Sequence, residues 1–330
     1  MKTQLSHKFE DVISIDNLLL AWQEFIKGKK NKKDVQIFSF YLMDNILLLH
    51  NDLKNRAYKH GGYERFRIND PKPRTIHKAS VRDRLLHHAV HRILYPFFDK
   101  TFISDSFSCR NGKGTHKAIN RFRKFGYIVS KNNTKTCWVL KCDIKKFFAS
   151  VDQDILINIL GQYIADKDII GLLRKIISSF KSSGLPLGNL TSQLFANVYM
   201  NELDQFIKHK MKVKYYIRYA DDFVILSEDE NYLKEIIPVI RNFLQDNLNL
   251  ELHPDKIFIK TLYSGVDFLG WVSFPGHRVI RNKTKNRIFK RLLEKNSSKT
   301  LNSYFGLLSH GNAQKIKNKI LKLYVENYGK

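Results

Sequence analysis

The stretch that decides the fold has two largely apolar runs on either side of adjacent carboxylates, Tyr216-Ile217-Arg218-Tyr219-Ala220-Asp221-Asp222-Phe223-Val224-Ile225-Leu226. Side chains alternate in character up to Tyr219, and an apolar run follows Asp222, which predicts a β-hairpin with the two acids at its tip. Two like charges there call for a counter-charge, and hard cations such as Mg²⁺ prefer carboxylate oxygen. Asp is also common in turns, so the pair alone leaves a polar turn and a metal site equally open.

A second acid stands near the end of another apolar run, Trp138-Val139-Leu140-Lys141-Cys142-Asp143. The run predicts a buried strand, and a helix is expected to start around Ser150-Val151-Asp152. An acid at the exit of a buried strand is costly unless it is paired or holds a metal. Taken together with Asp221 and Asp222, Asp143 therefore favours a carboxylate metal site over an acid that faces solvent.

Between these stretches, the glycine-containing loop Gly184–Gln193 opens a long helix. Apolar residues on one face of that helix are consistent with packing under a sheet: Leu194, Phe195, Val198, Tyr199, Leu203, Phe206 and Ile207. The glycines allow the backbone to approach a ligand closely, and the helix N-terminus favours anions. Gly184 and Gly188 are equally compatible with ordinary turns.

A basic segment precedes Asp143, because residues 61–118 are dense in Arg, Lys and His. Alternation over Gly62–Ile68 predicts a strand, and Ser80 is suited to cap the helix that follows. Lys72 and Arg74 lie between these two elements, where they are suited to grip phosphates, since Arg offers a bidentate fork. The segment therefore predicts a contact with a phosphate-bearing ligand.

Soft-metal and disulfide sites are not favoured. His87 and His91 have the spacing of metal ligands on a helix, but no third ligand accompanies them, so a polar helix face is the preferred interpretation. The three cysteines, Cys109, Cys137 and Cys142, are odd in number and show no C-x-x-C spacing. That usage is typical of a reducing cytoplasm.

Charge points to the class of partner. Among 330 residues, 57 Lys and Arg face 31 Asp and Glu, a formal net charge of +26. Such a balance favours a polyanion, nucleic acid or a membrane surface, over a small neutral substrate, although solubility or a ribosomal location also produces basic chains. The N-terminus lacks the apolar core of a signal peptide and no apolar run approaches the length of a membrane span, so we expect a cytoplasmic protein without a membrane partner.

The remaining segments are assigned by their patterns. Residues 1–60 are expected to be helical, Leu250–Lys256 a strand that ends in a turn, and Val266–Phe274 a strand pair. From 276 to 330, fourteen Lys or Arg face two acids. A basic helical lobe of this kind suits a duplex backbone, although a merely solvated basic face has the same pattern.

The order of these features resembles a reverse transcriptase of the non-LTR and bacterial kind, over roughly residues 60 to 330. Asp143-Ile144-Lys145-Lys146-Phe147-Phe148 looks like the first catalytic motif of that family, and Tyr219-Ala220-Asp221-Asp222 like its hallmark tetrapeptide. Arg74 matches the arginine that holds the incoming triphosphate, and Phe268-Leu269-Gly270 resembles the primer grip. The resemblance implies an α+β fold, a right-hand polymerase with fingers, a palm made of an antiparallel sheet backed by helices, and a helical thumb. The implied domains are an N-terminal helical extension (1–60), fingers and palm (61–275) and a basic thumb (276–330).

The resemblance also implies site roles. Two-metal nucleotidyl transfer would use Asp143, Asp221 and Asp222 as catalytic carboxylates that hold two Mg²⁺ ions. Nucleotide binding is implied for Lys72, Arg74, Phe148, Gly188 and Lys256, with Phe148 screening the sugar 2′-hydroxyl and Lys256 a candidate proton donor to pyrophosphate. Template, primer or fidelity roles are implied for Leu187, Asn189, Gln193, Phe268, Leu269 and Gly270. The expected partners are a template RNA, a primer or cDNA, and dNTPs.

One departure indicates a subfamily. Bacterial enzymes of the group II intron type usually carry Gln-Gly and then Ser-Pro before the long helix, whereas this chain has Leu187-Gly188 and Ser192-Gln193. This looks like the reverse transcriptases of diversity-generating retroelements, and Ser303–Asn312 also resembles their C-terminal region. The resemblance implies copying with errors at adenines, in company with a small, basic, oligomeric accessory protein.

Two alternatives stay open. A group II intron-like or retron-like reverse transcriptase would share the catalysis but not the accessory protein or the adenine errors, and Leu187 and Gln193 argue against it. A catalytically silent RNA-binding module derived from the same fold would keep the basic surface. Such a module is expected to have lost an aspartate, and all three are present.

Overall fold

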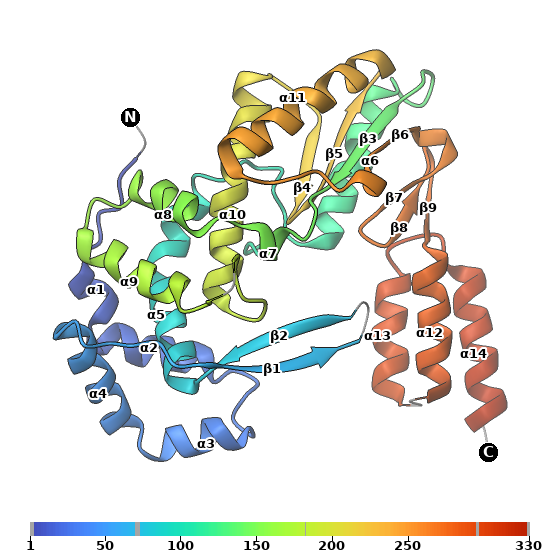
Figure 1. The fold of residues 1–330 in the computed structure, drawn as a ribbon. Coiled ribbons are helices and arrows are strands. Elements are labelled where there is room, and N and C mark those ends of the chain that lie inside the picture. Colours follow the sequence, from blue (N-terminus) through green and yellow to red (C-terminus); the bar gives the residue numbers. More distant parts are fainter. Residues whose placement is uncertain (1–2, 70–72, 182, 295–296, 329–330) are drawn as a thin grey trace. The chain divides into compact units, whose positions relative to one another are not determined.

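The computed structural model describes residues 3–69, 73–181, 183–294 and 297–328. The chain divides into two compact units, and each unit is assembled from three separate segments. Unit 1 consists of Met1–Ser104, Ile144–Met211 and Ile240–Leu252, and unit 2 consists of Asp105–Asp143, Lys212–Val239 and His253–Lys330. Figure 1 labels the elements in chain order.

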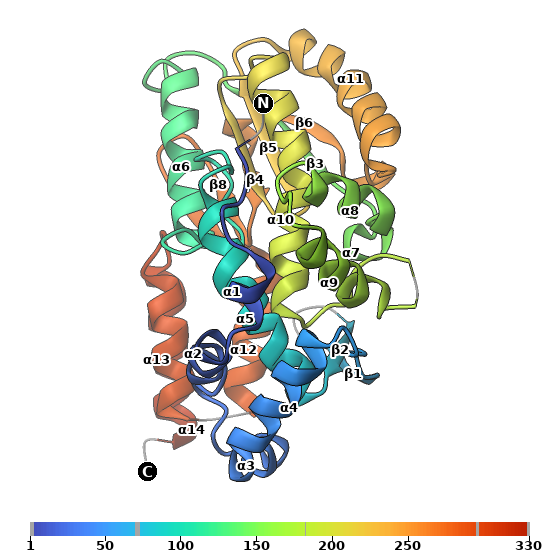
Figure 2. The ribbon, with the colours of Figure 1, turned by 90° about the vertical axis from the view of Figure 1, so that its left-hand side faces the viewer.

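Unit 1 is mainly helical. Its helices are α1 (Phe9–Ile13), α2 (Ile15–Phe25), α3 (Lys33–Phe40), α4 (Leu42–Lys54), α5 (Val81–Asp99), α7 (Phe147–Ser150), α8 (Gln153–Gly161), α9 (Lys167–Ser178) and α10 (Leu190–Gln205), which continues as a π-helix (Phe206–Lys210). The central element is α5, which packs against α2 and α10, as Figure 2 shows. Ser80 caps α5 by accepting a hydrogen bond from the Asp83 N–H, which confirms the predicted helix start.

A two-stranded antiparallel hairpin completes unit 1. It pairs β1 (Tyr63–Ile68) with β2 (Arg74–Ala79), in a register that runs from Tyr63 opposite Ala79 to Ile68 opposite Arg74. Most side chains of the hairpin are exposed or half-buried, and Ala79 is its only fully buried described residue. The hairpin therefore exposes Arg74 to solvent. The opposite end of the hairpin, where Tyr63 pairs with Ala79, is its anchored end.

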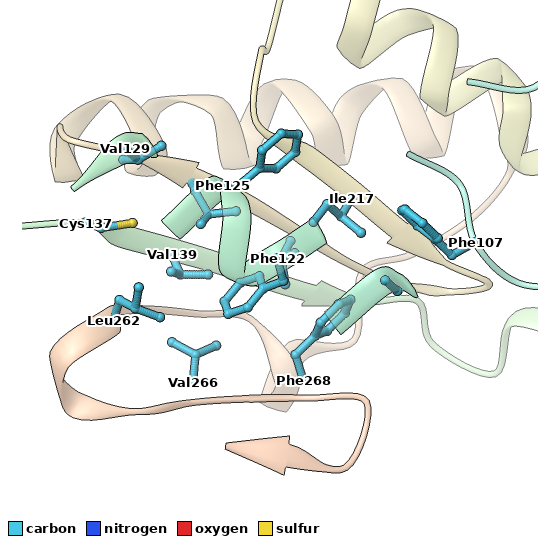
Figure 3. Close-up of a cluster of buried hydrophobic side chains, with 13 residues drawn as sticks. Phe107, Phe122, Phe125, Val129, Cys137, Val139, Ile217, Leu262, Val266 and Phe268 are labelled. Atoms are coloured by element: carbon cyan, nitrogen blue, oxygen red, sulfur yellow. The ribbon is translucent and has the colours of Figure 1, made fainter. Parts of the chain in front are cut away.

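Unit 2 contains a four-stranded antiparallel sheet of order β4-β5-β3-β6. Its strands are β3 (Trp138–Asp143), β4 (Tyr216–Tyr219), β5 (Asp222–Ser227) and β6 (Phe258–Thr261), and α6 (Thr115–Val129) packs against β4 and β5. A buried cluster that includes Phe122, Val139, Val224 and Phe268 joins this helix to the sheet (Figure 3). Helix α11 (Glu230–Leu248) follows β5 and contributes residues to both units.

The rest of unit 2 is a small sheet followed by helices. The antiparallel sheet β7-β8-β9 consists of Val266–Phe268, Trp271–Ser273 and Arg278–Ile280. Three helices follow, α12 (Asn282–Glu294), α13 (Ser298–Leu308) and α14 (Gln314–Tyr328), and they lie side by side in Figure 1. A second apolar cluster built around Trp271 and Ile288 holds them together.

The α+β fold, the β4–β5 hairpin, the strand that carries Asp143 and the helical C-terminal segment are confirmed. The predicted strand Leu250–Lys256 is wrong: Leu252 forms only an isolated bridge with Ile144, and a 3₁₀ helix (Pro254–Lys256) precedes β6. The polar-face interpretation of α5 is also wrong, because His87 is buried. None of the helices in the described part of the chain combines the length and apolar character that a membrane span requires.

Candidate active site

Two of the three predicted carboxylates are cross-strand neighbours in unit 2. Asp143, the last residue of β3, lies directly opposite Asp222, the first residue of β5. Directly opposed side chains project from the same face of an antiparallel sheet, so both carboxylates lie on one face at one end of the sheet. The strand pairing thus confirms that residues 79 positions apart (222 minus 143) are neighbours.

The third carboxylate sits in the turn between β4 and β5. Tyr219 pairs with Asp222, so Ala220 and Asp221 form a two-residue turn, and Ala220 has a φ of +57°. Arg218 supports this turn through hydrogen bonds. Its side chain is 0% exposed, and its guanidinium donates hydrogen bonds to the Ala220 carbonyl (3.0 Å) and to Ser106 Oγ (3.1 Å). A buried guanidinium therefore fixes the turn that presents Asp221.

Each of the paired carboxylates has its own lysine. Lys256 Nζ lies 2.8 Å from Asp143 Oδ1, and Lys141 Nζ lies 3.3 Å from Asp222 Oδ2. Burial nevertheless raises the pKa of Asp222 to about 7, helped by the charges of Asp143 and Asp221 and opposed by Lys141. The site is thus a cluster of carboxylates whose negative charge is only partly compensated.

The donor set suits a hard divalent cation. In the described ranges, no three His, Cys, Asp or Glu side chains are already gathered as a metal-ion site, and Asp143 and Asp222 are instead paired with lysines. Yet the buried Oδ1 atom of Asp222 has no hydrogen-bond partner among the described residues. An uncompensated buried carboxylate oxygen is costly, and Mg²⁺ satisfies such oxygens. The carboxylates therefore fit the predicted metal.

Unit 1 contains the loop that carries the predicted fidelity residues. The N–H of His77 on β2 donates to the Leu187 carbonyl (2.8 Å). Gly188 has a φ of +120°, and a Cβ atom there would lie 2.9 Å from Ile76 Cγ2. The loop is therefore pressed against β2, the same strand that begins with Arg74, so unit 1 brings the Leu187–Gly188 loop and the Arg74 strand together.

The start of α10 is also tied to the hairpin. Asn189, the N-terminal flanking residue of α10, is buried and donates from Nδ2 to the Tyr63 hydroxyl (3.4 Å). Its Oδ1 atom has no partner among the described residues. Gln193, one turn into α10, is exposed. Asn189 is thus a buried anchor, whereas Gln193 is available for contact.

The other predicted nucleotide-binding residues are placed as follows. Phe148 lies half-buried in α7, and its carbonyl accepts a hydrogen bond from Leu185 N–H (2.6 Å), which brings it next to the start of the loop. Lys256 lies beside Asp143 in unit 2. Lys72 lies outside the described residues.

The predicted primer-grip residues form the turn between β7 and β8. Phe268 pairs with Trp271, and the two-residue turn between them has positive φ at both Leu269 (+52°) and Gly270 (+88°). The Phe268 side chain is fully buried, with its ring 5.6 Å from that of Phe122. Phe268 therefore anchors the turn, while Leu269 and Gly270 form its tip.

Sequence reasoning missed two supporting residues of the site, Lys141 and Arg218. Both are charged residues inside otherwise apolar strands, and that is the signal by which they could have been found. A buried charge needs a partner, and each of them contacts the carboxylates or the turn that carries them.

The chain is similar to known proteins in sequence and in fold. The family described as "Reverse transcriptase (RNA-dependent DNA polymerase)" matches residues 58–273, more than half of the chain, and this range includes all three carboxylates. The solved structure of telomerase from Candida albicans, in complex with a TWJ fragment of telomeric RNA, superposes with a TM-score of 0.53. The identity is 11%, over 84% of this chain and 56% of the telomerase chain, so the likeness shows a shared fold.

Two curated relatives have names that refer to introns. The putative COX1/OXI3 intron 2 protein of Saccharomyces cerevisiae is 23% identical over 293 residues, covering 68% of this chain and 33% of the yeast protein. The group II intron-encoded protein LtrA of Lactococcus lactis subsp. cremoris is 24% identical over 278 residues, covering 62% of this chain and 45% of LtrA. The chain therefore spans less than half the length of either relative.

Proposed function

Because this chain belongs to the reverse transcriptase family, we propose that it is an RNA-directed DNA polymerase that makes cDNA on a template RNA. The observation that carries this proposal is the pairing of Asp143 with Asp222 across β3 and β5, with Asp221 in the adjoining turn. Carboxylates clustered at one end of a sheet suit nucleotidyl transfer, in which charge on a triphosphate must be neutralised. The net charge of +26 supports a nucleic-acid substrate.

In the proposed mechanism Asp143, Asp221 and Asp222 would hold two Mg²⁺ ions. When bound, such ions lower the pKa of a primer 3′-hydroxyl and neutralise the triphosphate and the leaving pyrophosphate. The strand register and the Arg218-supported turn hold the backbone that carries these carboxylates. Lys256, whose ammonium group donates a hydrogen bond to Asp143, is proposed to donate a proton to pyrophosphate.

Four of the five proposed nucleotide-binding residues, Lys72, Arg74, Phe148 and Gly188, belong to unit 1. Arg74 is exposed on β2, where its guanidinium can bind triphosphate oxygens in a bidentate manner, and Lys72 is proposed to assist it. Phe148 is proposed to exclude a 2′-hydroxyl by steric contact. The Leu187–Gly188 loop is proposed to line the nascent base pair, and the Leu269–Gly270 turn to contact the primer.

Primer extension tests the enzyme proposal. The wild-type protein, given Mg²⁺, dNTPs and a DNA primer on an RNA template, is expected to extend the primer, and Asp221→Ala is expected to abolish extension. Asp246→Ala, which removes an exposed acid on α11, serves as the matched control and is expected to keep activity. Equal extension by the wild type and Asp221→Ala, or none by the wild type with its partners supplied, would overturn the proposal.

We further propose that the enzyme is the error-prone reverse transcriptase of a diversity-generating retroelement, acting with a small, basic, oligomeric accessory protein. The supporting observation is Leu187, a half-buried apolar residue where an amide would be able to hydrogen-bond near the base pair. Sequencing cDNA tests this: Leu187→Gln is expected to lower misincorporation opposite adenine relative to other bases. Unchanged adenine errors in Leu187→Gln would reject the role of Leu187.

The second candidate function is a group II intron-like reverse transcriptase, and the intron-encoded relatives favour it. Such an enzyme is expected to copy adenines as accurately as other bases and to act without the accessory protein. The error spectrum of wild-type cDNA separates the two candidates, because errors concentrated at adenines support only the first.

A further inference from the structure

Lys141 occupies a specific place on the carboxylate face of the sheet. It is two residues before Asp143 on β3, so its side chain projects from the same face, and it lies diagonally across from Asp222 on β5. On that face, Val139 and Val224 belong to the buried apolar cluster shown in Figure 3. Lys141 therefore stands at the boundary between the hydrophobic cluster and the carboxylates.

The Lys141 ammonium joins two different hairpins. Its Nζ atom lies 3.3 Å from Asp222 Oδ2 on β5 and donates to the Asp267 carbonyl on β7 (2.9 Å). It also lies 6.0 Å from the centre of the Phe268 ring. The side chain is only 14% exposed, so little water competes for these partners and the contacts are stronger than at a surface.

The link continues beyond Asp267 to the start of α12. Asp267 Oδ2 accepts a hydrogen bond from Arg281 Nη1 (3.2 Å), and the Arg281 N–H donates to the Gly270 carbonyl (3.2 Å). The Arg281 carbonyl accepts from the N–H groups of Thr284 and Lys285, which places Arg281 at the start of α12. Arg281 thus contacts the Gly270 carbonyl in the β7–β8 turn and the Asp267 carboxylate, while Lys141 contacts the Asp267 backbone carbonyl.

The turn needs such external support. Leu269 has a φ of +52°, a conformation that is costly for a side chain of its size, and β7 and β8 are only three residues long. Strands this short contribute few ladder hydrogen bonds of their own. The position of the turn is therefore set largely by the buried side chain of Phe268, which precedes it, and by the polar contacts of Lys141 and Arg281.

We propose that Lys141 is a positioning residue that couples the β7–β8 turn to Asp222, so that the primer end and the catalytic carboxylates keep a fixed relation. This inference rests on the proposed polymerase function, in which the Leu269–Gly270 turn contacts the primer. A single ammonium bonded to a carboxylate on one hairpin and a backbone carbonyl on the other transmits any displacement between them. A misplacement of about 1 Å at a reacting centre costs up to about a hundredfold in rate.

Steady-state kinetics supply the first test. Lys141→Met keeps the length of the side chain and removes the charge, and we expect kcat for single-nucleotide extension to fall about tenfold or more while KM for dNTP changes less than about threefold. Lys141→Arg keeps the charge and donors, and is expected to recover most of the loss. Lys234→Met, which removes an exposed lysine paired with Glu230 on α11, is the control for charge loss alone.

A binding measurement supplies a readout that does not depend on catalysis. A 2-aminopurine at the primer 3′ end, bound without Mg²⁺ or dNTP, is expected to brighten in both Lys141→Met and Arg281→Met, because a displaced turn leaves the terminal base less stacked. If the two residues act through one link, the double variant changes no more than the larger single variant. Thermal melting of each variant identifies any loss that comes from unfolding.

Clear results would overturn the coupling. Wild-type kcat and fluorescence in Lys141→Met would do so, as would no rescue by Lys141→Arg in a protein with wild-type melting temperature, or additive effects of Lys141→Met and Arg281→Met. If the wild type binds primer–template but never extends it, the polymerase proposal fails, and the fluorescence comparison still decides whether Lys141 positions the turn.

Discussion

Asp143 and Asp222 face each other directly across two antiparallel strands, and each carboxylate is held by a different lysine. Like charges in directly opposed positions are unfavourable in a sheet, and burial adds to the cost of ionising them. These two opposed carboxylates are therefore expected to lower the free energy of unfolding of the metal-free protein.

Replacing Asp222 tests this cost. A carboxyl group whose pKa is 3.8 unfolded and about 7 folded binds its proton more tightly in the folded state, so stability falls as pH rises from about 4 to about 7. Asp222→Asn has no such group. We expect Asp222→Asn to abolish nucleotide incorporation. In EDTA, urea unfolding is expected to show that Asp222→Asn is more stable than the wild type, by a larger free energy of unfolding at pH 8 than at pH 5.

The control for this measurement is Asp246→Asn, an exposed acid on α11, which is expected to change little at either pH. An Asp222→Asn advantage of equal size at pH 5 and pH 8 would contradict the assignment of the cost to ionisation. Added Mg²⁺ is expected to stabilise the wild type more than Asp222→Asn, since it binds only the folded carboxylate site.

Arg218 is expected to be essential to the turn that carries Asp221. Arg218→Met leaves the Ala220 carbonyl and the Ser106 hydroxyl without this donor, and we expect the free energy of unfolding to fall by about 2–4 kcal/mol. Arg218→Lys is not expected to restore it, because one ammonium cannot reproduce the planar fork. Urea unfolding measures both effects.

Arg174→Met is the matched control, because Arg174 forms an exposed ion pair with Asp154. Its loss is expected to cost less than about 1 kcal/mol. A comparable loss in Arg174→Met and Arg218→Met would show that Arg218 contributes no more than a surface charge.

Gly188 is expected to tolerate no side chain. Its φ of +120° disfavours any L-residue, and a Cβ atom would lie 2.9 Å from Ile76 Cγ2 and 3.2 Å from the His77 carbonyl oxygen. Gly188→Ala should therefore push the loop away from β2 and raise KM for dNTP several-fold. Gly276→Ala, where nothing lies within 4 Å, is the control, and equal kinetics in both variants would count against the loop's proposed role.

Histidines on α5 are expected to make the protein sensitive to acid. Burial lowers the pKa of His87 to about 3 and those of His88 and His91 to about 4, below the usual 6.5. These histidines stay neutral in the folded protein and bind protons in the unfolded protein. Their contribution to the free energy of unfolding is therefore complete above pH 6.5 and is lost as pH falls through that value toward 3.

His87→Gln is therefore expected to lose less stability than the wild type between pH 7.5 and pH 5, by about 2 kcal/mol in urea unfolding. His209→Gln, which alters an exposed histidine outside α5, is expected to follow the wild type. If His87→Gln and the wild type lose stability in parallel, some other group must account for the acid sensitivity.

Local pattern was enough to predict the parts of the site that depend on neighbouring residues. The β4–β5 hairpin and the strand that ends in Asp143 were predicted because apolar runs and turn residues are encoded within about ten positions. Ser80 was predicted as a cap for the same reason, since its partner, the N–H of Asp83, is three residues away.

Contacts between distant residues could not be predicted in this way. Lys141 meets the Asp267 carbonyl across 126 positions, and Arg218 meets Ser106 across 112. The predicted strand Leu250–Lys256 failed for a related reason: Leu250 and Leu252 have strand-like alternation, but Leu252 forms only a single bridge, and Pro254 begins a 3₁₀ helix. A strand requires a partner as well as a pattern.

The interleaving of the two units has a consequence for synthesis on the ribosome. Strand β3 lies in the interior of the four-stranded sheet, yet both of its neighbours, β5 and β6, are made later. At about 5–20 residues per second, the 79 positions from Asp143 to Asp222 take roughly 4–16 seconds to translate. Throughout that interval both edges of an apolar strand lack their native partners, and unpaired edges promote aggregation. The fraction of the protein that reaches its folded state is therefore expected to depend on how well β3 is kept from aggregating until β5 and β6 have been made.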